Sequence, residues 1–180
     1  NVGYPKPNLS HFRSIEIWDT ASSSSEYLDA GWLTRSFMAA PLPPGSAADG
    51  VVVGGAELGP LGGAASRAVT LTNPEQFLNQ SRFAMPGNTT AGNPALAHVL
   101  RVEQAVIGAA ARLRADRTFT TAFPTGNFGN AVRTAAQVAA ANAGIPVIKL
   151  ALNGFDTHVG QLARQARLLK DLAEGIVALK

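Results

Sequence analysis

The chain has 180 residues, the size of a single domain, and 46% of them are hydrophobic, which is enough for one ordinary core. Only 15% are charged, and the 15 basic residues behind the net charge of +3 are dispersed, so the sequence lacks the clustered basic patch that nucleic acid binding requires. The absence of cysteine excludes disulfides, thiolate metal sites and a cysteine nucleophile, and no apolar run approaches the roughly 20 residues that span a bilayer.

The first forty residues predict two short helices. Residues 1–7 contain two prolines and a glycine, which is typical of an extended entry. Ser10 is placed as a helix N-cap, and the apolar spacing that follows it predicts a half-buried helix to about Thr20. Apolar residues also recur every three or four positions over 27–38, so we predict a second short helix there that ends before Pro41.

The segment 41–94 is rich in glycine, proline and alanine, and we interpret it as a loop-rich insertion. Two β-branched runs within it, 51–53 and 69–71, predict short strands. A short helix is predicted over 74–78.

The remaining residues, 95–180, predict the helix-helix-strand-helix part of an α/β core. This order of elements indicates a parallel sheet flanked by helices. The expected elements are helices over 95–117, from about 127 or 130 to 142, and from 159 onward, with a buried, mostly apolar strand over 147–152 between the last two.

Two potential metal ligands follow the predicted strand. Asp156 and His158 lie just past its carboxyl end, where open α/β sheets bind their ligands. At this i, i+2 spacing an extended backbone directs both side chains to one side, and Gly154 allows a tight turn there, so the pair is suited to a divalent cation. The alternative is that Asp156 or Thr157 only caps the helix that begins near Val159.

Polar side chains at the start of the first predicted helix admit two interpretations. His11, Arg13 and Ser14 offer an imidazole, a guanidinium and a hydroxyl group that can contact an anionic substrate. Alternatively, Arg13 pairs with Glu16 or Glu26 on a solvated face of the helix.

Three motifs are distributed over nearly the whole length of the chain. They occupy residues 3–18, residues 31–35 and residues 144–161, the last ending in Asn153-Gly154-Phe155-Asp156-Thr157-His158-Val159-Gly160-Gln161. In this order they resemble motifs of the bacterial domain of unknown function 1501 family, whose second motif reads Gly-Trp-Leu-Gly-Arg and whose third reads Gly-[Phe/Trp]-Asp-Thr-His-x-x-Gln.

This resemblance implies an alkaline-phosphatase-like or sulfatase-like fold, export by the twin-arginine route to the periplasm or cell surface, and hydrolysis of small anionic phosphate or sulfate esters. It places a divalent metal, zinc, manganese or calcium, on Asp156 and His158. A non-catalytic exported binding protein of the same fold is the alternative. The other superfamily ligands and the nucleophile are expected before Asn1 and beyond Lys180, so we interpret residues 1–180 as one partial domain and expect it to be inactive alone.

Overall fold

The computed structural model describes residues 3–46, 48–71, 96, 100, 118–142 and 144–180. Within these ranges the chain is a mixed α/β structure with a parallel three-stranded sheet and four α-helices, which confirms the predicted fold class at this level. The elements in chain order are α1 (His11–Thr20), α2 (Trp32–Ala39), β1 (Val51–Val53), the 3-10 turn η1 (Gly59–Leu61), β2 (Val69–Leu71), α5 (Gly126–Ala140), β3 (Ile148–Leu150) and α6 (Gln161–Ala178).

Strand β1 occupies the centre of the sheet, with the order β2-β1-β3 and both neighbours parallel to it. Val51 pairs in register with Val69 on one side and with Ile148 on the other. All three residues of β1 are buried. This is expected of a central parallel strand when helices cover both faces of its sheet.

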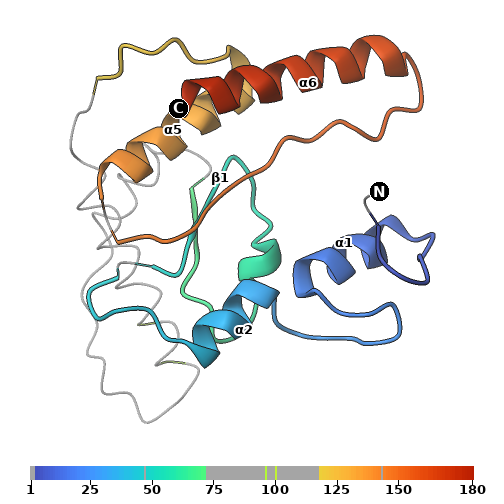
Figure 1. Cartoon of the computed structure of the whole chain (residues 1–180), viewed down its shortest axis with the longest axis vertical. Helices are drawn as coiled ribbons and strands as arrows, with labels where there is room; N and C mark the ends of the chain where they lie inside the picture. The colour runs from blue at the N-terminus through green and yellow to red at the C-terminus, as the bar shows by residue number, and fades with distance from the viewer. Residues whose placement is uncertain (1–2, 47, 72–95, 97–99, 101–117, 143) are drawn as a thin grey trace.

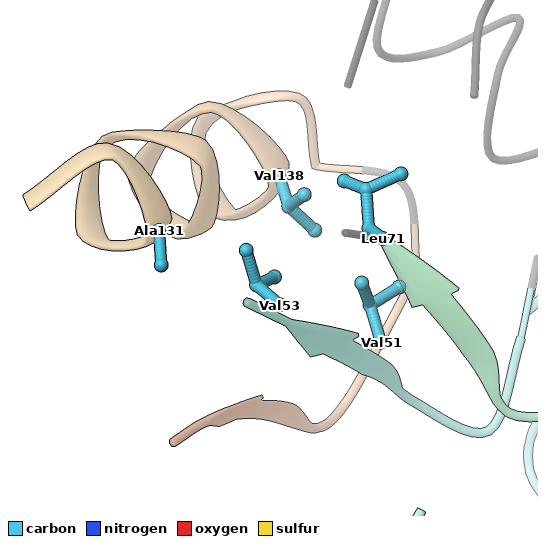
Figure 2. Close-up of a cluster of buried hydrophobic side chains, with 5 residues drawn as sticks. All are labelled: Val51, Val53, Leu71, Ala131 and Val138. Atoms are coloured by element: carbon cyan, nitrogen blue, oxygen red, sulfur yellow. The ribbon is translucent and has the colours of Figure 1, made fainter. Parts of the chain in front are cut away.

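One face of the sheet packs against α5. The cluster in Figure 2 joins Val51, Val53 and Leu71 of the strands to Ala131 and Val138 of the helix. Successive strand residues face opposite sides, so the two outer valines of β1 share this face. Helix α6 packs on α5, and both helices lie on the same side of the sheet in Figure 1.

The other face of the sheet packs against α2 and η1. Val52 contacts this layer, where it is buried with Leu61 and Ala68, and Leu33 and Phe37 of α2 pack against them. Helices α1 and α2 lie on this side in Figure 1, opposite α5 and α6. The described residues therefore form three layers with the sheet in the middle.

Helix α1 matches its prediction, since Ser10 caps it by accepting a hydrogen bond from the backbone N–H of Arg13 at 3.4 Å. Helix α2 is shorter than predicted, because it begins at Trp32 and not at residue 27. The carbonyl groups of Ser23 and Glu26 accept hydrogen bonds from the Arg13 side chain. This tertiary contact fixes the backbone before α2 in a non-helical conformation.

Strands β1 and β2 lie where the sequence predicted them, so the described part of 41–94 supplies two of the three described strands and belongs to the sheet. Strand β3 is shorter than the predicted 147–152 and is half-buried, because β1 is its one neighbour among the described strands. Helices predicted over 74–78 and 95–117 fall almost entirely outside the described residues. Within the described part, no helix is long and apolar enough to cross a membrane.

Candidate functional site

The loop between β3 and α6 carries Asp156 and His158. Figure 1 shows it leaving the sheet and running along α6 to the far end of that helix before the helix begins. Gly154 adopts a φ of 106°, which only glycine tolerates well, but residues 151–157 form neither a turn nor a bend, so the predicted tight turn is not found there. Beyond it, His158 Nε2 lies 3.4 Å from Asp156 Oδ1. The two side chains therefore converge, as their i, i+2 spacing predicted.

The alternative interpretation, that Asp156 or Thr157 caps the last helix, is wrong. Helix α6 begins at Gln161, later than predicted, and its N-cap residue is Gly160, with no side-chain hydrogen bond to the cap. A capping side chain must lie directly before the first helical residue to reach the free N–H groups. The carboxylate of Asp156 is thus available for another role.

A second histidine approaches Asp156 from the other end of the chain. His11, the first residue of α1, places Nδ1 4.0 Å from Asp156 Oδ2. The two histidines therefore approach different oxygens of one carboxylate. All three side chains are well exposed, by 76% for His11, 66% for Asp156 and 84% for His158. Sequence reasoning selected all three residues but assigned His11 to substrate and the other two to metal, and it did not predict that they meet.

The separation of the Asp156 and His158 donor atoms suits a shared metal ion. Two ligands bound to one tetrahedral zinc at about 2.0–2.2 Å lie about 3.3–3.5 Å from each other. Across the described residues, however, no group of three or more His, Cys, Asp or Glu side chains is arranged to hold a metal. The His11 imidazole lies near the other carboxylate oxygen of Asp156. The described residues therefore supply two metal ligands, Asp156 and His158, with a second imidazole nearby.

Arg13 points away from this cluster. Its guanidinium donates to the carbonyl groups of Ser23 and Glu26, lies 2.7 Å from the Glu16 carboxylate through Nη1, and stacks 3.8 Å from the centre of the Tyr27 ring. The predicted pairing with Glu16 is confirmed, but the side chain is buried and not on a solvated face. Arg13 therefore holds the segment after α1 against that helix.

Ser14 is also engaged within the protein. Its hydroxyl group lies 2.8 Å from the Tyr4 hydroxyl and donates to the carbonyl group of Asn8 at 3.0 Å. The backbone N–H of Asn8 donates to the Tyr4 hydroxyl at 3.0 Å. This network folds the proline-rich entry against α1, and a contact between Ser14 and substrate stays a prediction.

Sequence reasoning missed the two opposite charges of Asp19 and Lys149, which both lie near Gly59. Lys149, at the middle of β3, donates to the carbonyl group of Glu57 at 2.6 Å. Gly59 leaves room for the pair, because a Cβ there would lie 2.6 Å from the lysine Nζ and 2.9 Å from Asp19 Oδ1. Burial raises the pKa of Asp19, Lys149 opposes this rise, and Glu57 adds to it. In the sequence, the one indication of this interaction is that Lys149 is the only charged residue in the mostly apolar run 147–152.

Comparison of this chain with protein-family models, with curated proteins and with solved structures found no match. The family resemblance of the three motifs therefore stays a prediction, as do the residue roles that it implies. The α/β fold and the convergence of His11, Asp156 and His158 rest on the structure itself.

Proposed function

We propose that Asp156 and His158 bind a divalent cation in an alkaline-phosphatase-like or sulfatase-like protein that hydrolyses small anionic phosphate or sulfate esters. One observation carries the proposal. The third motif presents a carboxylate and an imidazole at a spacing that fits one metal ion, and His11 of the first motif lies 4.0 Å from the same carboxylate. Two segments selected independently from the sequence thus meet at one point.

The donor atoms favour a particular group of metals. Carboxylate oxygen and imidazole nitrogen suit zinc and manganese, and calcium is favoured less because it prefers oxygen ligands alone. Such a cation stabilises negative charge on a phosphoryl or sulfuryl oxygen. His11 is exposed beside the pair, and when protonated its imidazole can hold an anionic ester at the same place.

The proposed location is the periplasm or the cell surface, reached by the twin-arginine route. Its support is the resemblance of the motifs at residues 3–18, 31–35 and 144–161. The parallel sheet between helical layers is compatible with the alkaline-phosphatase-like architecture that the same resemblance implies.

The second candidate is a non-catalytic exported binding protein with the same fold. The observation that favours it is exposure, because the side chains of His11, Asp156 and His158 are each at least 66% accessible. Catalytic metal sites surround the ion with three protein ligands and a shaped, largely dry cavity. An open site with two ligands fits recognition of an anion better than its turnover.

Calorimetric titration of the chain with zinc, manganese and calcium chlorides tests the metal proposal. We expect at least one of these ions to bind, and Asp156→Asn to weaken that binding by about tenfold or more because it removes the charged ligand. Asp29→Asn is the matched control, since Asp29 is exposed in the loop before α2. The absence of binding by all three ions, or equal affinity in the Asp156→Asn variant, contradicts the proposal.

An assay with an aryl phosphate and an aryl sulfate separates the two candidates. We expect the 180-residue chain to bind metal without turnover, because two ligands leave the ion without the partners that catalysis needs. Turnover that is lost in Asp156→Asn would favour the hydrolase. Metal-dependent retention of the ester without turnover favours the binding protein.

A further inference from the structure

A cavity of about 250 Å³ lies between α2 and the segments that lead into β1 and β2. It opens at the amino ends of these strands, whereas Asp156 follows the carboxyl end of β3, so it is separate from the candidate metal site. Five of its eight lining residues have apolar side chains, and these are Phe37, Met38, Pro41, Leu42 and Ala65. A concave site that combines apolar side chains with a few placed polar groups is the usual form of a small-molecule pocket.

An arginine held in place by a buried carboxylate forms the polar side of this cavity. Arg67 donates from Nε at 3.0 Å and from Nη2 at 2.7 Å to Asp49 Oδ1, and its backbone N–H donates to Oδ2 at 2.9 Å. The Asp49 side chain is 8% exposed and that of Arg67 is 33% exposed. The carboxylate therefore fixes the guanidinium, which a ligand can still reach.

The contacts with Asp49 use only one edge of the Arg67 guanidinium. Within the described residues, Arg67 Nη1 makes no hydrogen bond. N–H groups on the edge formed by Nη1 and Nη2 thus remain available to a ligand. Two parallel N–H groups of an arginine match the two oxygens of a carboxylate. Because Asp49 already orients the side chain, a ligand would not have to order it.

Thr34 of α2 adds a second polar group to the cavity wall. The residue is 2% exposed, and its Oγ1 has no hydrogen-bond partner among the residues that the structure describes. A buried hydroxyl without a partner is costly, but this oxygen is closed off from solvent, so a ligand in the cavity would reach it only after a small movement of the wall. This observation is independent of the Asp49–Arg67 pair.

We propose that this cavity binds a small organic carboxylate. The carboxylate pairs with the open edge of Arg67, and the apolar body of the ligand lies against Phe37 and Leu42. An inorganic anion would satisfy the arginine but would leave the apolar walls in contact with water. A purely apolar molecule would leave the guanidinium edge unpaired.

A nuclear magnetic resonance titration of the whole ¹⁵N-labelled chain with phenylacetate tests this proposal. We expect saturating shifts of the Met38 and Arg67 amide signals with a dissociation constant near about 1 mM. Phenylacetamide has the same shape without the charge, and inorganic phosphate has charge without the apolar body. Each should bind about tenfold more weakly or worse. Equal binding of phenylacetamide, or no shift at up to about 10 mM phenylacetate, overturns the proposal.

Two substitutions probe the two sides of the cavity. Arg67→Lys keeps the charge that Asp49 needs but removes the forked edge, and Ala65→Leu enlarges an exposed residue at the cavity wall. Each should weaken phenylacetate binding by about tenfold, while the exposed control Arg164→Lys leaves it unchanged. A dispersed spectrum shows that each variant is folded, and unaltered affinity in either folded variant overturns the proposal.

Discussion

Arg13 of α1 contacts the segment that follows this helix. It bonds to the carbonyl groups of Ser23 and Glu26 and lies over the Tyr27 ring. Replacement of Arg13 by Met should lower the free energy of unfolding by about 2–4 kcal/mol, because it leaves those carbonyl groups without their donor. The pair with Glu16 contributes little of this, since the glutamate side chain is 40% exposed.

Urea denaturation measures this loss, with Arg164→Met as the control. Arg164 is exposed on α6, so its replacement should change stability by no more than about 0.5 kcal/mol. Equal losses in the two variants would show that Arg13 does not hold the segment after α1.

Asp19 should make stability depend on pH in the direction opposite to most carboxylates. Its pKa is raised above the ordinary 3.8 by burial, so the folded state takes up a proton more readily than the unfolded state. The resulting stabilisation is complete below the ordinary pKa and is lost as pH rises through the raised one. We therefore expect Asp19→Asn to be more stable than the unsubstituted protein at neutral pH, by up to about 0.5 kcal/mol because the group is half-buried.

Urea denaturation of both proteins between about pH 3 and pH 7 checks this expectation, since subtracting the two curves removes the contribution of all other groups. The advantage of the variant should grow with pH across this interval. A variant that is less stable at pH 7 would show that the attraction of Lys149 exceeds the cost of burial.

Gly31 determines how closely α2 approaches η1. Its N–H donates to the carbonyl group of Gly62 at 2.9 Å, and an added Cβ would overlap the carbonyl group of Pro60. The backbone angles of Gly31, φ −61° and ψ 154°, are ones that alanine also adopts. The effect of a substitution therefore comes from the steric overlap of the added Cβ and not from backbone strain. Gly31→Ala should cost about 2–3 kcal/mol, which lowers the melting temperature by about 5–10 °C.

Differential scanning calorimetry measures the melting temperature of this variant, with Gly3→Ala as the control. Gly3 has no atom within 4 Å of an added Cβ, so its replacement should leave the transition within about 2 °C. A similar small change in Gly31→Ala would mean that η1 can move away from α2 at little cost.

Most individual elements could be placed from the sequence, whereas their ends and burial could not. The Ser10 cap and the β-branched runs at 51–53 and 69–71 act through neighbouring residues, and the structure confirms these elements. The start of α2 depends instead on hydrogen bonds from Arg13, and the half-burial of β3 depends on its place in the sheet. Both depend on contacts between segments that local patterns do not contain.

The candidate site shows the same division between local and distant interactions. Asp156 and His158 converge, as their i, i+2 spacing predicts for an extended backbone. The capping alternative remained open until the first residue of α6 was known. The approach of His11 to Asp156 joins positions near opposite ends of the chain, and no local pattern encodes it.

For the molecule as a whole, the order of helices and strands was sufficient to predict a parallel sheet between helical layers, because parallel strands require crossover connections and each apolar face must be covered. Only the folded structure shows that β1 is the central strand, that Arg13 is buried, and that Asp49 and Arg67 border a cavity with Thr34. Hydrophobic periodicity and capping act over a few residues, whereas strand order and side-chain contacts depend on how distant surfaces fit together.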